Sequence, residues 1–136
     1  MTTCLDTNVL VDVLGGRRPE VRLRYQAELS ANRNMVVSSL TAHELAYGAF
    51  LSRRPDQHWA ELQRLLAQLD VIEWSAEDAY AAARLRARLR REGQTIGNFH
   101  ALIAGQALSR GWTLVTANIR EFVRVEGLIL EDWTQP

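Results

Sequence analysis

Acidic and amide side chains follow several predicted strands of this chain, close to the points where those strands end. Asp6 comes directly after the segment TTCL, and Glu44 lies in the helix that follows MVVSS. Asn118 follows WTLVT, and Glu121 lies three residues later. Carboxylates that converge on one pocket repel each other, and a hard divalent cation such as Mg²⁺ relieves that repulsion through oxygen ligands. The pattern therefore predicts an oxygen-rich metal pocket.

Each of these residues also has a purely structural interpretation. Asp6 can cap the helix that starts after it, and Asn118 can shape a turn. Glu44 stands three residues after Thr41, which is the spacing of a capping box. Taken singly, the structural interpretations are preferred. Convergence of all these groups at one end of a sheet would favour a functional pocket instead.

A lone histidine, His100, lies in the first turn of a predicted helix, within the segment IGNFHALIAGQAL. The positive end of the helix dipole favours a carboxylate at such a position and disfavours an imidazolium. A neutral imidazole suits Mn²⁺, Zn²⁺, Ni²⁺ or Fe²⁺ better than Mg²⁺. Because apolar residues surround it at helical spacing, His100 can equally be a packing residue at the edge of the core.

Composition favours one soluble domain over residues 1–136. Sixteen basic and sixteen acidic residues cancel, so any contact with RNA has to come from a local patch. The single cysteine, Cys4, cannot form an internal disulfide, which fits a reducing compartment. No apolar run reaches the roughly 20 residues that span a bilayer, and the N-terminus lacks the features of a signal peptide. We therefore expect a cytoplasmic protein without a membrane contact.

Short strands alternate with helices along the chain. Strands are expected at 2–5, 35–39, 71–74, 112–118 and within 127–133, and helices at about 7–14, 19–31, 40–51, 55–69, 76–91, 98–110 and 119–122. This alternation predicts an α/β fold in which helices cover both faces of a short parallel sheet. Such sheets bind ligands at the carboxyl ends of their strands, where the acidic and amide residues are expected.

Three segments of the chain carry a family resemblance: LDTNVLVDVL, SSLTAHELAYGA and IGNFHALIAGQALSRGWTLVTANIREFVRVEGLILEDW. They resemble the PIN-domain toxins of VapC type, the ribonuclease half of bacterial VapB–VapC toxin–antitoxin pairs, and their FitB relatives. The resemblance covers essentially the whole chain, in order and at family spacing. It implies a three-layer α/β/α sandwich around a short central parallel sheet. It also implies Mg²⁺-dependent endoribonuclease activity, often directed at tRNA or ribosomal RNA.

The resemblance assigns roles to individual residues. Asp6, in LDTN, matches the first acidic residue of the family and would ligate the metal directly, and Glu44 matches the second. Asn118, in VTAN, matches a position where many members have asparagine or aspartate. Glu121, in REF, matches a commonly polar or acidic position at the edge of the site. Small polar groups that support the family's pocket correspond to Thr7, Asn8 and Thr116.

His100 is the residue at which this chain departs from the family pattern, because the family has aspartate there. Three explanations stay open. His100 could join Asp6 and Glu44 in holding Mg²⁺ or Mn²⁺ with an altered metal preference, the change could weaken or abolish cleavage, or His100 could be a packing residue. The alternative function is accordingly a weakened or silent PIN domain that acts as an antitoxin-binding or regulatory module. A phosphoacceptor domain that uses Asp6 is a third interpretation, but the chain has no lysine to complete it.

The resemblance also implies partners. They are a VapB-like antitoxin whose C-terminal segment covers the active site, a second copy of the chain in a homodimer, and a higher toxin–antitoxin assembly. DNA would be bound only through the antitoxin. Apolar residues on the first helices would suit such contacts if they are not core, namely Val9, Val13 and Tyr25. Four arginines are predicted near the RNA phosphates, namely Arg17, Arg18, Arg120 and Arg124.

Overall fold

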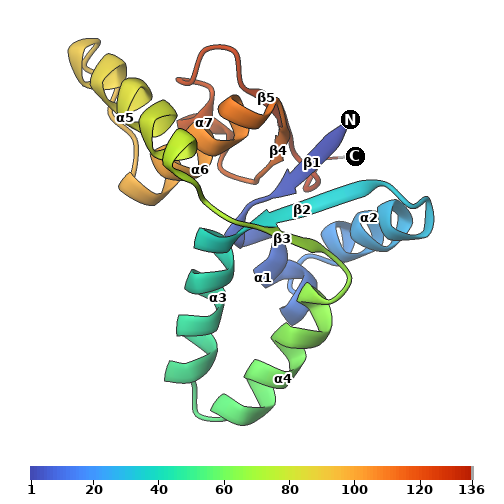
Figure 1. Ribbon diagram of the computed structural model, residues 1–136. Helices are drawn as coiled ribbons and strands as arrows, with labels where there is room; N and C mark the ends of the chain where they lie inside the picture. Colours follow the sequence, from blue (N-terminus) through green and yellow to red (C-terminus); the bar gives the residue numbers. More distant parts are fainter. Residues whose placement is uncertain (136) are drawn as a thin grey trace.

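The computed structural model of the chain describes residues 1–135 and contains a five-stranded parallel sheet (Figure 1). Its strands are β1 (Thr2–Leu5), β2 (Asn34–Ser38), β3 (Asp70–Ile72), β4 (Thr113–Val115) and β5 (Ile129–Glu131). They lie in the order β3-β2-β1-β4-β5, so β1 is central. The chain runs outward from β1 to β3 and then crosses to β4 and β5. The order therefore reverses between β1 and β4, where parallel sheets form ligand crevices.

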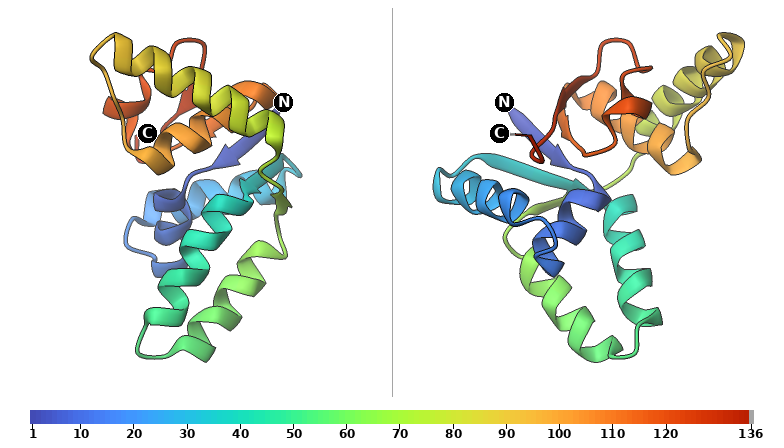
Figure 2. Two further views of the ribbon diagram at one scale, coloured as in Figure 1. Left: turned by 60° about the vertical axis from the view of Figure 1, so that its left-hand side comes forward. Right: turned by 180° about the vertical axis from the view of Figure 1, so that it is seen from behind.

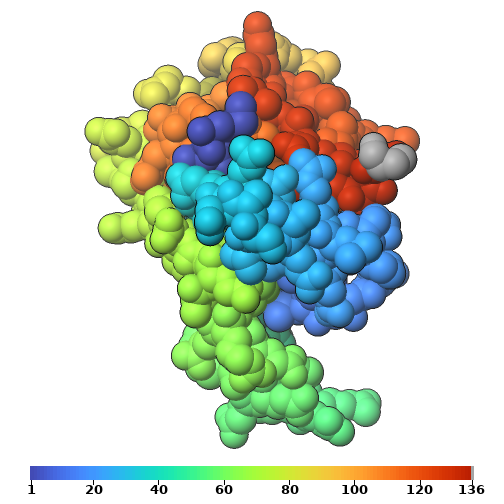
Figure 3. Space-filling model, turned by 90° about the vertical axis from the view of Figure 1, so that its right-hand side faces the viewer, coloured from blue at the N-terminus to red at the C-terminus, as the bar shows by residue number. Residues whose placement is uncertain are grey.

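Helices cover both faces of the sheet. They are α1 (Thr7–Gly15), α2 (Pro19–Ser30), α3 (Ser39–Leu51), α4 (Pro55–Leu66), α5 (Ala76–Arg91), α6 (Asn98–Arg110) and α7 (Ile119–Phe122). Helices α1 to α4 lie on one side, and α5 to α7 lie on the other (Figures 1 and 2). The turn between α3 and α4 projects from the body of the molecule (Figure 3).

The side chains of each strand point alternately to the two faces of the sheet, so the apolar core is divided into two clusters. In β1, Leu5 packs into the apolar cluster beneath α1 to α4, whereas Cys4 packs into the cluster beneath α5 to α7. Successive strand residues point to opposite faces, so each buried strand contributes to both clusters. The predicted three-layer α/β/α sandwich is thus confirmed.

Most element boundaries agree closely with the sequence pattern, but β4 ends at Val115 rather than at residue 118, and α4 ends at Leu66 rather than at residue 69. The predictions for residues 2–5, 98–110 and 119–122 are confirmed to the residue. The capping box of Thr41 and Glu44 is wrong, because α3 starts directly after β2 and Ser38 is its cap. The Ser38 hydroxyl accepts a hydrogen bond from the backbone N–H of Leu40, at 3.2 Å. Glu44 is therefore free of any capping role.

The apolar residues considered for partner contacts belong to the core instead. Val9, Val13 and Tyr25 are all buried beneath the sheet face that α1 and α2 cover. The exposed apolar side chain of α1 is Val11, which points to the opposite side of this helix. A surface for partners on the first helices therefore has to be built from other residues.

Cys4 is a buried core residue with a free thiol. Burial, together with the nearby charge of Asp6, raises the pKa of this thiol to about 12. The thiol is therefore protonated and unreactive at neutral pH. Within residues 1–135, none of the helices is both long enough and apolar enough to cross a membrane.

Helices α5 and α6 approach each other closely at Gly105. A Cβ added at Gly105 would lie 2.5 Å from the Cα and 2.7 Å from the Cβ of Ala82, which is buried in α5. We expect Gly105→Ala to lower the free energy of unfolding by about 1–3 kcal/mol, because the two helix backbones have to separate. Urea denaturation measures the change.

Gly48 provides the matched control for this substitution. It lies within α3, and a Cβ added there would meet no atom within 4 Å. Gly48→Ala should leave stability unchanged or raise it by up to about 1 kcal/mol, because alanine has the higher helix propensity. A Gly105→Ala protein as stable as the unsubstituted chain would contradict the close packing.

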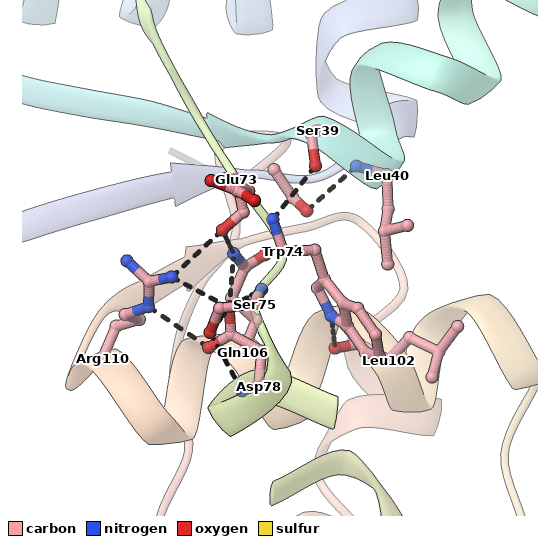
Figure 4. Close-up of polar contacts among 10 residues, drawn as sticks. Ser39, Leu40, Glu73, Trp74, Ser75, Asp78, Leu102, Gln106 and Arg110 are labelled. Atoms are coloured by element: carbon pink, nitrogen blue, oxygen red, sulfur yellow. Dashed lines mark hydrogen bonds and ion pairs between the residues drawn. The ribbon is translucent and has the colours of Figure 1, made fainter. Parts of the chain in front are cut away.

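A buried carboxylate also joins α5 to α6 (Figure 4). Asp78, in the first turn of α5, is fully buried and completes a capping box with Ser75. Its two oxygens accept hydrogen bonds from Arg110, at 2.9 and 3.2 Å, and from Gln106, at 3.2 Å. Both partners are on α6. This network therefore fixes the C-terminal part of α6, the helix that carries His100 in its first turn.

Candidate active site

Asp6 lies at the carboxyl end of the central strand and is 3% exposed. Its backbone N–H donates to the carbonyl of Val115 in β4, at 2.9 Å. Its Oδ1 accepts from the backbone N–H of Thr7, at 2.9 Å, which makes Asp6 the cap of α1. Its Oδ2 accepts from the hydroxyl of Thr116, at 2.8 Å. The structural interpretation of Asp6 is therefore correct, and it leaves the carboxylate in a fixed orientation.

Glu44 is joined to Asp6 through Thr7. The Thr7 hydroxyl donates to Oε1 of Glu44, at 2.8 Å, although the two residues are 37 positions apart in the chain. The neighbouring N–H of Thr7 holds Asp6. One residue at the start of α1 thus holds a carboxylate from the end of β1 and another from α3.

These carboxylates open onto a cavity of about 540 Å³ at the carboxyl end of the sheet. Six residues selected from the sequence line it: Asp6, Thr7, Asn8, Glu44, His100 and Asn118. Glu121 does not line the cavity but contacts two residues that do. The structure therefore brings the predicted residues together around one space.

Glu121 holds His100 in place. Oε2 of Glu121 lies 2.8 Å from Nδ1 of His100 and accepts a hydrogen bond from the side-chain amide of Asn118, also at 2.8 Å. Oε1 of Glu121 accepts from the backbone N–H of Gly97. The Gly97 hydrogen bond lowers the pKa of Glu121 against the opposing effect of partial burial, and Asn118 and His100 add to the lowering. Because Nδ1 of His100 faces Glu121, the ring nitrogen that has no carboxylate partner is Nε2.

The oxygen atoms of this cavity suit a hard divalent cation. Each oxygen of Asp6 accepts one hydrogen bond, which leaves further lone pairs on the carboxylate. Glu44 supplies a second carboxylate, and Asn118, whose amide nitrogen is occupied by Glu121, supplies a carbonyl oxygen. Mg²⁺ is commonly held by one or two carboxylates while water or phosphate completes its shell. The residues present fit that pattern.

His100 does not complete a compact set of metal ligands. Within residues 1–135, no group of three or more histidine, cysteine, aspartate or glutamate side chains is placed to hold a metal ion. His100 contacts Glu121 and packs its ring against Phe122, with ring centroids 5.2 Å apart. Its role as a metal ligand remains a prediction.

Two of the four arginines predicted near the RNA phosphates line the cavity. They are Arg17 and Arg18, which follow α1. Arg120 and Arg124 do not line it, and the guanidinium of Arg124 donates to a backbone carbonyl of the loop between α5 and α6, at 2.8 Å. Their contact with RNA phosphates therefore stays a prediction, and it would have to be made outside the cavity wall.

Sequence reasoning missed Asp12, Val11 and Phe99, which also line the cavity. Asp12 is buried and lies 3.7 Å from the guanidinium of Arg18. The helical spacing of Asn8, Val11 and Asp12 on α1 would have placed all three on one face. Phe99 had no comparable signal, since only the fold brings the first turn of α6 to this cavity.

Comparison with known proteins identifies the family. The PIN domain profile matches residues 3–128 of this chain, which includes every residue of the site described above. The chain belongs to the PIN-domain family. This PIN domain is 38% identical over 130 residues to the tRNA(fMet)-specific endonuclease VapC of Shigella flexneri, covering 96% of each chain. It is 36% identical over 133 residues to the ribonuclease VapC2 of Rickettsia felis, covering 98% of each.

Solved structures agree with this assignment. The PIN domain superimposes on a chain of VapBC2 from Rickettsia felis, bound to a DNA fragment from its promoter, with a TM-score of 0.90 and 34% identity. The match covers 98% of this chain and 99% of that one. FitAcB from Neisseria gonorrhoeae shares the fold, with a TM-score of 0.85 at 20% identity. The predicted membership of the VapC-type PIN domains is confirmed.

Proposed function

We propose that this PIN domain is a divalent-metal-dependent endoribonuclease, the cytoplasmic toxin of a VapBC-type pair, which cleaves tRNA or ribosomal RNA and so inhibits translation. The observation that carries the proposal is that Thr7 hydrogen-bonds to both Asp6 and Glu44 at the wall of one cavity. The relatives named as ribonucleases support RNA as the substrate.

Asp6 and Glu44 would hold the ion, which we propose to be Mg²⁺ or Mn²⁺. When bound, the ion supplies charge stabilisation at the scissile phosphate and activates the attacking water. Thr7 and Thr116 keep the two carboxylates oriented through their hydrogen bonds. Arg17, at the cavity wall, is placed to bind a phosphate oxygen of the RNA.

Asn118 and Glu121 act as positioning residues in this proposal. The Asn118 amide donates to Glu121, so its carbonyl oxygen is left to orient water or a ligand in the cavity. Glu121 orients His100 through Nδ1. Such indirect contacts tune the affinity of a metal site although they do not touch the ion.

The partner we propose is a VapB-like antitoxin, since the similar solved structures include VapBC complexes, some of them bound to DNA. We further propose a homodimer within the larger toxin–antitoxin assembly. DNA binding would depend on the antitoxin rather than on this chain. A gel-shift experiment with promoter DNA should therefore give a complex only when the antitoxin is present.

Cleavage of RNA by the purified chain tests the proposed function. Total tRNA and ribosomal RNA are incubated with the protein in Mg²⁺, and the products are separated on denaturing gels. We expect discrete fragments that disappear with EDTA and return when Mg²⁺ is restored. Intact RNA under all of these conditions, with either Mg²⁺ or Mn²⁺, would overturn the proposal.

A catalytically weak or silent PIN domain is the second candidate, and His100 is the observation that favours it. The chain has an imidazole where the family pattern has a carboxylate, and that imidazole contacts Glu121. Such a protein would bind the antitoxin without cutting RNA. The same cleavage assay therefore separates the two candidates.

The exchange His100→Asp is expected to raise the affinity for Mg²⁺ about tenfold. The new carboxylate would add one negative charge and hard oxygens to a cavity that already contains Asp6 and Glu44. Isothermal titration with Mg²⁺ and with Mn²⁺ measures both affinities. We expect a smaller gain for Mn²⁺, because the imidazole that is removed suits Mn²⁺ better than Mg²⁺.

His58→Asp is the matched control for this exchange. His58 is an exposed histidine of α4 that contacts Ser52, at 2.7 Å, and does not line the cavity. Its replacement adds the same charge elsewhere and should leave both metal affinities unchanged. Equal affinities of the His100→Asp protein and the unsubstituted chain would contradict a metal site beside His100.

A further inference from the structure

Three aromatic rings form an exposed row beside the cavity. They are Tyr47 and His43 of α3 and Phe99 of α6, and we refer to them as the aromatic row. The ring of His43 is nearly parallel to that of Tyr47, at 10°, and to that of Phe99, at 4°. Tyr47 is 62% exposed and Phe99 is 37% exposed. Two helices that are distant in sequence thus present aligned rings to solvent.

The three rings form a short stacked series that is exposed to solvent. The centroids of neighbouring rings are 6.4 and 6.5 Å apart. Carbon atoms in contact lie about 3.5–4.0 Å apart, so parallel rings at this centroid distance either leave a gap or are displaced sideways. Because Tyr47 and Phe99 at the two ends of the row remain exposed, further flat rings can extend this stacked series.

The row begins at the wall of the proposed cleavage site. Phe99 lines the cavity and precedes His100, and His43 precedes Glu44. Arg17 and Arg18 line the same cavity. A phosphodiester held between these arginines and the two carboxylates would bring the adjoining nucleotide close to Phe99.

We infer that the aromatic row stacks the bases that adjoin the scissile phosphate, so that His43, Tyr47 and Phe99 are base-binding residues of this PIN domain. The inference rests on the proposed ribonuclease function. Proteins commonly bind unpaired RNA bases by stacking them on aromatic side chains, which a base enclosed in a helix cannot reach. The row thus determines which part of an RNA enters the cavity.

The shape of the row favours a nucleobase over a peptide segment as its occupant. Nearly parallel rings match a series of flat bases, whereas an apolar peptide side chain is bound best in a concave pocket. The edges of His43 and Tyr47 carry polar atoms that can hydrogen-bond to base edges. The adjacent arginines complement the phosphates that connect those bases.

Binding of a short oligoadenylate that carries one 2-aminopurine tests the inference. The measurements are made in the Asp6→Asn background to prevent cleavage, with Tyr47→Leu and Phe99→Leu as variants that keep an apolar side chain but remove the ring. We expect each variant to weaken binding about fivefold or more and to reduce the quenching of 2-aminopurine fluorescence that stacking causes. An RNA duplex should bind the parent protein less tightly than the single strand does.

Tyr80→Leu is the matched control, because Tyr80 is 63% exposed but lies on α5, away from the row. Tyr80→Leu should leave the affinity for the oligoadenylate and the quenching of 2-aminopurine fluorescence unchanged. Single-strand affinity and quenching that survive Tyr47→Leu and Phe99→Leu would overturn the inference and leave a protein partner as the occupant of the row. RNA cleavage by the chain with Asp6 intact is measured separately. An absence of base stacking on the aromatic row is thus distinguished from an absence of ribonuclease activity.

Discussion

Replacement of Asp6 by asparagine is expected to lower kcat/KM for RNA cleavage about a hundredfold or more while the protein stays folded. Asparagine is as good a helix cap as aspartate, because its side-chain oxygen can accept the hydrogen bond from the backbone N–H of Thr7. Its NH2 group, in place of Oδ2, can donate to the Thr116 hydroxyl instead of accepting from it. It removes the negative charge that would hold the divalent ion. The charge stabilisation that such an ion supplies amounts to several kcal/mol, which corresponds to at least a hundredfold in rate.

Asp12→Asn is the control for the loss of charge alone. Asp12 is also buried, lies on α1 and lines the cavity, but its carboxylate faces Arg18. We expect Asp12→Asn to lower kcat/KM by less than about tenfold, since an ion pair with a half-exposed arginine contributes little free energy. Circular dichroism and urea denaturation verify the fold of both variants. Comparable losses in the two variants would contradict a specific role for Asp6.

Removal of the buried carboxylate in Asp78→Ala is expected to lower the free energy of unfolding by roughly 3 kcal/mol. The change eliminates the capping box of α5 and the hydrogen bonds from Gln106 and Arg110. The loss of a cap and of buried charged hydrogen bonds each costs on the order of 1–3 kcal/mol, and Arg110 can turn toward solvent, which limits the sum. Glu77→Ala, at the exposed neighbouring position, should change stability by less than about 0.5 kcal/mol.

The effect of Asp78 should depend on pH. Burial alone raises the pKa of Asp78, but the hydrogen bonds and charge of Arg110, together with Ser75, outweigh it and hold the pKa below the ordinary value of 3.8. A carboxyl group with a lowered pKa stabilises the folded state above its ordinary pKa and loses that contribution as the pH falls through the lowered value. The stability difference between the unsubstituted protein and Asp78→Ala should therefore shrink as the pH falls below about 3.8. A stability difference between the two proteins that stays constant as the pH falls would contradict the lowered pKa of Asp78.

Local signals explain how much of the fold could be predicted. The strand at 2–5 is a short apolar segment followed by a capping residue, and the helix at 98–110 ends at Gly111, which adopts a left-handed conformation. Such signals depend only on neighbours in the chain. The cap of α3 was predicted wrongly because Ser38 is both the last residue of β2 and the cap of the next helix, so no loop separates the two elements.

Contacts between distant segments explain what could not be predicted in the site. The pairing of His100 with Glu121 depends on how α6 meets α7, and the Thr7 bridge depends on how α1 meets α3. Neither contact has a sequence spacing that reveals it. That Arg120 and Arg124 do not line the cavity could not be predicted either, because topology gives the end of the sheet but not the direction in which the side chains near α7 point.

The central position of β1 has a consequence for the synthesis of this protein. The carboxylate of Asp6 is oriented by Thr116 and its backbone by β4, although Thr116 is 110 positions later in the chain. A nascent chain that stops before residue 116 therefore lacks the partners that fix this carboxylate. The proposed ribonuclease would thus have its Asp6 carboxylate held in place only after the ribosome has made β4 and Thr116.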